Sequence, residues 1–358
     1  MSQVWFTPVN NNEVKAKIQN KALNLLQTGL AEKNILDSDD FTALKIHFGE
    51  RKNTGYIKPE YLQGLVDELK ANQVKPFYTD TNTLYKGQRA NSIDHLNQAH
   101  EHGFSRDNTG IPVIIADGLL SKNFSKVEIE GKHFAEVNIA NDILHSDVLI
   151  GLSHVTGHLA TCLGATIKNI GMGCASRSGK QLQHADVSPT VSAGKCTTCG
   201  QCVEWCPVNA IEIINEKAEI DPEICYGCAE CIATCRFGAI SVSWGGTSEA
   251  LQEKMVEYAL GAIKDKKDKS LYFNFLIKIT KDCDCEGKAQ ERVIDDIGIL
   301  VSFDPVAVDQ ATIDLLNQKA NSDFLKELWS ESNLDYRTQL QHAENLGLGS
   351  REYELIEL

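Results

Sequence analysis

The stretch "SDVLIGLSHV", residues 146–155, decides the fold class. It is an apolar run of strand length in which polar and apolar residues do not alternate. A run of this kind is typical of a strand buried on both faces, as in a parallel sheet covered by helices on each side. The stretch therefore predicts an α/β architecture.

Segments with strand and helix patterns alternate on both sides of this run. Strands are predicted at 42–50, 75–82, 111–118, 270–280 and 295–304, with a hairpin over 126–140. Helices are predicted at 12–30, 59–72, 89–104, 247–266 and 305–318, with Thr247 and Asp304 as N-caps and Pro59 and Pro305 in first turns. This alternation predicts an α/β domain around a mainly parallel sheet flanked by helices.

The alternation is interrupted between residues 191 and 245, where cysteines are dense and long periodic segments are lacking. The simplest organisation is one α/β domain built from residues 1–190 and 246–358. A small α+β domain, residues 191–245, is then inserted into it.

The inserted segment holds two copies of the spacing C-x2-C-x2-C-x3-C, "CTTCGQCVEWC" and "CYGCAECIATC". This is the pattern of bacterial two-cluster ferredoxins, in which the fourth cysteine of each copy ligates the other cluster. One [4Fe–4S] cluster is assigned to Cys196, Cys199, Cys202 and Cys235. The second is assigned to Cys225, Cys228, Cys231 and Cys206.

Zinc is the alternative for so many cysteines, but zinc sites take four ligands in two pairs rather than two sets of four. One departure from the ferredoxin pattern is Arg236, which follows the last cysteine where proline is usual. We expect this arginine to alter a cluster potential more than cluster assembly.

Composition limits the classes of partner. The 358 residues carry a formal net charge of -14, which argues against nucleic acid or an anionic membrane. The first twenty residues do not read as a secretory signal, and no apolar run has the length of a membrane span. A cytoplasmic protein is expected, in which clustered cysteines indicate metal binding or catalysis.

Four cysteines remain outside the two copies. Cys162 reads as a core residue, whereas Cys174, Cys283 and Cys285 are candidate ligands of an additional metal ion or cluster, together with a His or Asp. The alternative for Cys283 and Cys285 is a pair of reduced thiols, because the neighbouring Asp282 and Asp284 raise thiol pKa values.

A glycine-rich stretch, "KNIGMGCASRSGK" (168–180), precedes the inserted segment. Its glycines and its cations predict an anion-binding loop, although a plain turn explains the residues as well. Just upstream, two histidines follow the apolar strand, at the end where ligands gather in open α/β sheets. The resulting candidate site residues are His154, His158, Lys168, Asn169, Arg177 and Lys180.

A second polar stretch, "DTNTLYKGQR" (80–89), follows another predicted strand and would line the same cleft, or else makes local turn bonds. Its candidates are Asp80, Asn82, Tyr85, Lys86 and Arg89. Asp309, inside a predicted helix, is open to either a structural or a functional role. No flavin or nicotinamide motif is present at a convincing level.

Together, "FYTDTNTLYKGQR", "SHVTGH", "IKNIGMGCASRSGK", the paired cysteine motif, "CDC" and "DIGILVSFDPVAVDQA" resemble the uncharacterised iron–sulfur centre proteins of anaerobic bacteria and archaea. The α/β part of that family is a domain of unknown function. The resemblance runs over roughly residues 40–320. It implies a cytoplasmic [4Fe–4S] protein with its functional site in the α/β domain.

The sequence therefore predicts an iron–sulfur redox enzyme in which two clusters relay electrons from a redox partner protein to a site in the α/β domain. The cations of that site would hold a small anionic substrate. Two alternatives stay open: an electron carrier or adaptor without catalysis, and a maturation factor that delivers electrons or metal to another protein.

Overall fold

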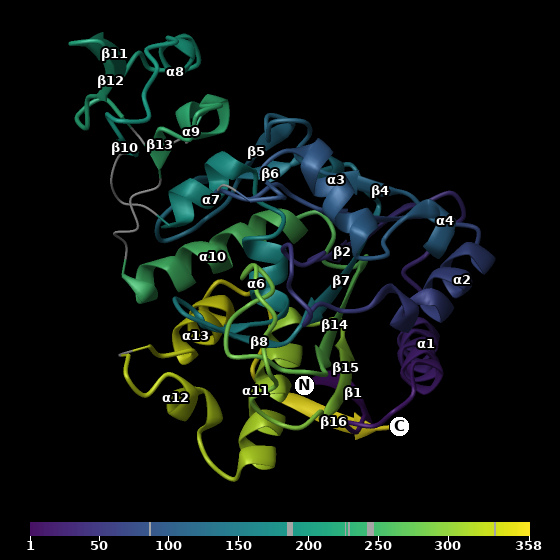
Figure 1. Ribbon diagram of the computed structural model, residues 1–358. Helices are drawn as coiled ribbons and strands as arrows, with labels where there is room; N and C mark the ends of the chain where they lie inside the picture. Colours follow the sequence, from purple (N-terminus) through teal and green to yellow (C-terminus); the bar gives the residue numbers. More distant parts are fainter. Residues whose placement is uncertain (86, 185–188, 226, 228–229, 242–246, 333) are drawn as a thin grey trace.

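An eight-stranded sheet forms the centre of the molecule in the computed structural model, which describes residues 1–358 except 86, 185–188, 226, 228–229, 242–246 and 333 (Figure 1). Its order is β16-β1-β15-β14-β7-β2-β3-β4, and only β15 runs against the other strands. The strands are β1 (Ser2–Pro8), β2 (Phe41–Ile46), β3 (Lys75–Asp80), β4 (Val113–Ile115), β7 (Val148–His154), β14 (Ser270–Leu276), β15 (Gly298–Ser302) and β16 (Tyr353–Glu357).

The strand β7 lies in the interior of the sheet and is buried on both faces, as its unbroken apolar sequence predicts. It pairs in parallel with β2 and β14, so that Leu152 lies between Ile46 and Phe273. Residues 148–153 are all buried, because helices cover both faces. The prediction of a mainly parallel sheet flanked by helices is therefore confirmed.

Two apolar clusters separate the helices into two layers. Alternate residues of β7 face them, with Leu149 in one cluster and Ile150 in the other. One layer contains α1 (Lys15–Glu32), η1 (Pro59–Tyr61), α2 (Gln63–Ala71) and α3 (Ser92–Glu101). The other contains α6 (Thr166–Gly171), α10 (Ser248–Ile263), α11 (Pro305–Ala320) and α13 (Arg337–Asn345). Shorter elements around them are α4 (Arg106–Thr109), β5 (Phe124–Glu128), β6 (Glu136–Ala140), α5 (Asn141–Leu144), β8 (Thr156–His158), β9 (Cys162–Gly164), α7 (Arg177–His184) and α12 (Phe324–Leu328).

The predicted helix starts agree with the structure at two caps. Thr247 Oγ1 accepts the Ala250 N–H at 3.2 Å at the start of α10. Asp304 Oδ1 accepts the N–H groups of Val306 and Ala307 at 2.8 and 3.0 Å at the start of α11. These bonds satisfy backbone donors that have no partner within the helix.

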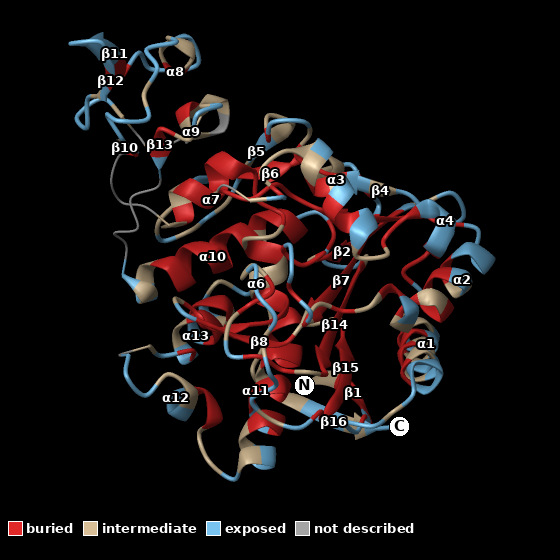
Figure 2. Ribbon diagram, viewed as in Figure 1, coloured by how far each residue is buried: buried red, intermediate tan, exposed pale blue. Residues whose placement is uncertain are grey.

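The described residues of the cysteine-rich segment form short elements: β10 (Thr190–Val191), α8 (Gln201–Glu204), β11 (Ile211–Ile214), β12 (Lys217–Ile220), α9 (Glu230–Thr234) and β13 (Ile240–Ser241). Figure 1 shows them beyond the end of α7, away from the central sheet. They contact the rest of the molecule through Lys122, which pairs with Glu230 at 2.8 Å and lies 3.1 Å from the centre of the Trp205 ring. Figure 2 shows that most described residues of this segment are exposed or intermediate.

The two cysteine motifs share backbone conformation as well as spacing. The residue before the second cysteine has a positive φ in each copy, 59° at Thr198 and 77° at Gly227. The residue three positions after the fourth cysteine does too, with 54° at Asn209 and 60° at Gly238. Left-handed backbone is uncommon outside glycine, so these matching positions indicate two equivalent structural repeats.

Candidate functional site

A cavity of about 580 Å³ lies at the carboxyl ends of β2, β3, β7 and β14. These strands are parallel neighbours, so the residues that follow them meet at one edge of the sheet. Its wall is formed by residues at and after the ends of β2 and β3, the end of β7, the helix α6 and the loop after β14. The cavity wall contains ten of the predicted site residues: Asp80, Tyr85, Arg89, His154, His158, Lys168, Asn169, Lys180, Cys283 and Cys285.

Buried ion pairs form one wall of the cavity. Lys45 Nζ lies 2.9 Å from Asp80 Oδ1, and Arg89 lies 3.4 Å from the other oxygen of Asp80 and 3.3 Å from Glu50. Burial alone would raise the pKa of Asp80, but Lys45 and the other nearby positive charges hold it well below its usual value. Buried ion pairs add little net stability because desolvating the charges is costly. The network therefore places the buried charges of Lys45, Asp80 and Arg89 at the cavity wall.

Two further lysines present positive charge to the cavity. Burial lowers the pKa of Lys168, and likewise that of Lys180, to about 8. Lys180 donates to the Ala175 carbonyl at 2.7 Å and to the Thr81 hydroxyl. Lys168 has no acceptor or carboxylate partner among the residues that the structure describes. Its ammonium group is thus available to an anion that enters the cavity.

His154, the last residue of β7, has both ring nitrogens occupied. Nδ1 lies 2.8 Å from Asp284 Oδ2, and Nε2 donates to the Ile277 carbonyl at 2.9 Å. Burial opposes protonation, yet the Asp284 carboxylate and these hydrogen bonds raise the pKa of His154 above its usual value. His154 therefore holds the loop that follows β14, and neither nitrogen is free to ligate a metal.

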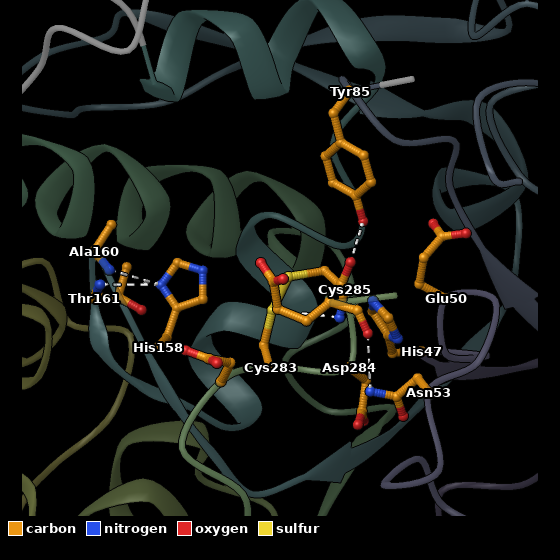
Figure 3. Close-up of a disulfide and its surroundings, with 12 residues drawn as sticks. His47, Glu50, Asn53, Tyr85, His158, Ala160, Thr161, Cys283, Asp284 and Cys285 are labelled. Atoms are coloured by element: carbon orange, nitrogen blue, oxygen red, sulfur yellow. Dashed lines mark hydrogen bonds between the residues drawn. A yellow bond between two sulfur atoms is a disulfide. The ribbon is translucent and has the colours of Figure 1, made fainter. Parts of the chain in front are cut away.

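His158 has the opposite arrangement. Its Nδ1 accepts the N–H groups of Ala160 and Thr161 at 3.2 and 3.1 Å. Burial lowers the pKa of His158 well below its usual value, so the ring is neutral and its proton is on Nε2. Figure 3 shows this second nitrogen on the side of the ring that faces Cys283 and Cys285.

Cys283 and Cys285 form a disulfide in the structure (Figure 3). Their sulfurs and a ring nitrogen of His158 all lie within 4.8 Å of one another. Cys174 does not join this group. It is completely buried in the larger apolar cluster, and burial raises the pKa of its thiol to about 11. The structure thus brings together two of the three cysteines predicted for an additional metal and adds His158 to them.

Two of the predicted residues, Asn169 and Arg177, make structural hydrogen bonds. Asn169 bridges strands, because its amide donates to the carbonyls of Lys45 and Leu152, each at 3.1 Å. Arg177 lies outside the cavity wall and donates to the Thr83 carbonyl at 2.9 Å and to that of Ala90. Lys86 is outside the described residues.

Asp309 is a helix cap in the structure. Its carboxylate accepts the N–H groups of Thr166 and Ile167 at 2.9 and 2.8 Å and an N–H of Asn274 at 2.7 Å. It therefore fixes the start of α6, the helix that carries Lys168.

A second, smaller cavity lies in the cysteine-rich segment. Its wall includes Cys196, Cys199, Cys202 and Cys235, the four residues assigned from spacing to one cluster. Of the other set, Cys206 and Cys231 belong to the small apolar cluster of the same segment, whereas Cys228 lies outside the described residues.

Backbone N–H groups point at cysteine sulfurs in both repeats. The Ala210 N–H donates to Cys206 Sγ at 3.1 Å, and the Ala239 N–H donates to Cys235 Sγ at 3.3 Å. In each case the donor is four residues after the fourth cysteine of its motif. Such hydrogen bonds stabilise thiolate charge and tune cluster potentials.

The sequence analysis missed Lys45 and His47 as cavity residues. The sequence did contain a signal for Lys45, because a lysine within an otherwise apolar strand is buried only when it is paired. Its partners in the structure are Asp80 and Asn169.

The model of the family described as a domain of unknown function, DUF362, matches residues 42–314. The chain belongs to this family. The match confirms the resemblance inferred from the motifs of this DUF362 protein.

Three curated relatives show shorter similarities to the DUF362 chain. Hydrogenase-4 component A of Escherichia coli K12 is 32% identical over 90 residues, or 25% of this chain and 43% of that protein. Pyruvate synthase subunit PorD of Methanothermobacter marburgensis is 32% identical over 80 residues, or 22% and 91%. A ferredoxin-like protein in the nif region of Sinorhizobium fredii is 41% identical over 51 residues, or 13% and 80%. The chain thus spans less than half of the first of these relatives and most of the other two.

Among solved structures, a Thermotoga maritima protein aligns with a TM-score of 0.45 and 9% identity, covering 88% of this chain and 61% of its own. The lactate racemase apoprotein of Thermoanaerobacterium thermosaccharolyticum aligns with a TM-score of 0.39 and 10% identity, covering 77% and 51%. Within the described part of the DUF362 chain, no helix has the length and apolarity needed to cross a membrane.

Proposed function

We propose that this DUF362 protein is an iron–sulfur electron-transfer protein. In this proposal a ferredoxin-like domain, residues 191–245, is inserted between parts 1–190 and 246–358 of the α/β domain and binds two [4Fe–4S] clusters. The clusters pass single electrons to the cavity at the carboxyl edge of the sheet, where a small anion is bound and reduced.

The observation that carries the proposal is the placement of the first set of cysteines. Cys196, Cys199, Cys202 and Cys235 are up to 39 residues apart in sequence, yet they line one cavity. For zinc, with Zn–S bonds of about 2.3 Å, tetrahedral sulfurs would lie roughly 3.8 Å apart. Among the described residues, these four are not a group whose ligand atoms converge within 4.8 Å. A wider set of sulfurs fits a cubane, whose four irons separate the ligands.

The relatives support the same direction. One is named as ferredoxin-like, and two are named as a component of hydrogenase-4 and a subunit of pyruvate synthase. These names favour electron exchange with a redox partner protein. The Lys168 ammonium group has no hydrogen-bond or ion-pair partner among the described residues and lines the cavity with Lys45 and Lys180, which supports an anionic ligand there.

Metal analysis of protein purified without oxygen tests the proposal. We expect about eight iron and eight sulfide per chain, with a paramagnetic signal on reduction by dithionite. Changing Cys199 to Ser should halve the intact cubane signal, whereas Cys174→Ala should leave the iron content unchanged. Fewer than four irons per chain, or zinc in place of iron, would contradict the proposal.

A further inference from the structure

The cavity wall contains a second redox group, the disulfide between Cys283 and Cys285. It lies in the loop after β14, at the edge where the parallel strands end (Figure 3). Cys283 is buried, whereas Cys285 is partly exposed. Solvent and small solutes in the cavity can therefore reach at least one sulfur.

Hydrogen-bond donors surround the two sulfurs. The Cys285 N–H donates to Cys283 Sγ at 3.4 Å. A ring nitrogen of His158 lies within 4.8 Å of both sulfurs, and its Nε2–H faces them. Cleavage of a disulfide leaves negative charge on sulfur, and donors of this kind stabilise a thiolate. The surroundings thus suit a disulfide that opens and closes.

The two acidic neighbours do not oppose this chemistry, because each is paired. Asp282 lies 3.0 Å from Lys288 Nζ, and Asp284 lies 2.8 Å from His154 Nδ1. Their charges are therefore compensated by cations instead of acting on the sulfurs alone.

A bound metal ion is the competing explanation for His158, Cys283 and Cys285. A histidine ligand gives the lone pair of one nitrogen to the metal and donates the N–H of the other nitrogen to an acceptor. His158 does the reverse, since its Nδ1 accepts two backbone N–H groups and its Nε2 keeps the proton. The backbone around Ala160 thus fixes His158 as a donor toward the sulfurs.

We propose that Cys283 and Cys285 are a dithiol–disulfide centre that exchanges an electron pair with the anion bound in the cavity. Reduction breaks the S–S bond, and two electrons and two protons convert it to two thiols. The protons come from solvent in the cavity, while His158 Nε2–H stabilises the sulfur that carries charge. The electrons come from a low-potential one-electron donor through the clusters, a route that rests on the proposed function. In the reverse step the two thiols re-form the disulfide, and the two electrons and two protons that they release pass to an anionic substrate, which is reduced.

Trapping of thiols in redox buffers tests the centre directly. The full chain is equilibrated without oxygen in dithiothreitol buffers of graded ratio, quenched with acid and N-ethylmaleimide, and the peptide containing residues 283–285 is measured by mass spectrometry. We expect a reversible two-electron titration curve that is unchanged by Cys174→Ala. Thiols that stay free in every buffer would overturn the proposal. Zinc binding by the two sulfurs would also overturn it. After zinc is added to the reduced chain, this result would appear as two sulfur neighbours of zinc in the X-ray absorption spectrum, and Cys283→Ser would remove it.

The role of His158 has a separate readout. His158→Ala should slow alkylation of the reduced centre about tenfold at fixed pH, because a hydrogen bond to a charged sulfur is lost. His158→Gln keeps an N–H donor and should restore part of the rate. Equal rates in all three proteins would show that His158 does not act on the sulfurs.

The two proposals can fail separately. Cys283→Ser should abolish the titration and leave the iron content unchanged. A chain with Cys199→Ser and Cys225→Ser, one change in each proposed set of cluster ligands, should still respond to dithiothreitol but no longer to reduced methyl viologen, a one-electron donor. If protein that contains no iron still shows the titration, the proposal of two clusters fails and the proposal of a dithiol–disulfide centre stands. Full viologen reduction in the double variant would overturn the route through the clusters.

Discussion

The α/β region and the cysteine-rich segment differ in what holds them together. The sheet and its helices enclose two large apolar clusters, one on each face. The segment from β10 to β13 has one small cluster, whose buried members are Cys202, Ile211, Ala218, Cys231 and Ile240. Two of these five are proposed cluster ligands, so the apolar part of this core is smaller still.

Buried polar groups therefore have different roles in the two regions. In the α/β region, charges such as Lys45 and Asp80 are buried in a structure that apolar packing already stabilises. In the cysteine-rich segment, the proposed clusters would themselves supply the missing core, as metal does in small metal-binding domains. The region with the larger core should therefore tolerate loss of its ligand, and the other should not.

Iron removal gives the largest expected effect. Ligation of structural metal in small domains contributes on the order of 10 kcal/mol, so loss of both clusters should unfold the cysteine-rich segment. We expect rapid proteolysis within residues 191–245 after oxidative iron removal with a chelator, mapped by mass spectrometry. The α/β region should keep its circular dichroism and its melting transition. Joint unfolding of both regions would break the comparison.

A substitution at Asp309 should destabilise the α/β region and leave the proposed clusters in place. Its carboxylate ties α11 to the start of α6 through two hydrogen bonds and to Asn274 of β14 through a third. Asp309→Ala should lower the free energy of unfolding of this region by about 3 kcal/mol, because buried N–H donors lose their acceptor. Chemical denaturation followed by circular dichroism measures the loss, while iron per chain should match the unchanged protein.

The pH dependence of Asp309 sharpens this result. Burial raises the pKa of Asp309 from 3.8 to about 6, so the folded chain binds the proton more tightly than the unfolded chain. Stability from this group is therefore greatest at low pH and falls as pH rises through 6. Relative to Asp309→Asn, the unchanged protein should lose about 1 kcal/mol between pH 5 and pH 7. A flat difference would show that the carboxyl group does not titrate there.

The central fold was predictable because the signals were local. The apolar run of β7 and the caps Thr247 and Asp304 each act within a few residues. The strands β1 and β16 were missed, because their place at the edge of the sheet depends on pairing between the two ends of the chain, as between Val4 and Leu355. Such pairing leaves no mark in a short window of sequence.

The loops that form the candidate site could be predicted from the sequence, whereas the contacts between their side chains were harder to predict. Position after a parallel strand placed His154, and its neighbour His158, at the correct edge of the sheet. Sequence cannot show that Nδ1 of His158 accepts two N–H groups, or that Cys174 is enclosed by the core. Those facts depend on tertiary packing, and they are the basis for proposing thiol redox chemistry there instead of metal binding.

A substitution at Lys168 should raise the stability of the fold, by less than the loss expected for Asp309→Ala. Burial lowers the pKa of Lys168 from 10.5 to about 8, so its charge at pH 7 destabilises the fold. Lys168→Met should raise the free energy of unfolding by about 2 kcal/mol at pH 7, with a smaller gain as pH rises through 8 toward 10.5. Denaturation at pH 7 and pH 9 measures this. Phosphate, as a probe anion, should bind about tenfold more weakly to the variant, with Lys122→Met as the control outside the cavity. A less stable Lys168→Met chain would show that the lysine supports the fold.

Arg236 gives the smallest expected effect and tests whether the two repeats are equivalent. It follows Cys235 where Pro207 follows Cys206, and the backbone beyond both has the same left-handed residue, Gly238 or Asn209. Arg236→Pro should leave the iron content unchanged, because the ligand geometry of the other repeat already accommodates proline. Loss of a positive charge near a cluster disfavours the added electron, so one cluster potential should become more negative by tens of mV, on the order of 1 kcal/mol. A redox titration followed by paramagnetic resonance measures the shift, with Arg236→Lys as the charge-preserving control. An equal shift in Arg236→Lys would show that the positive charge is not the cause of the shift.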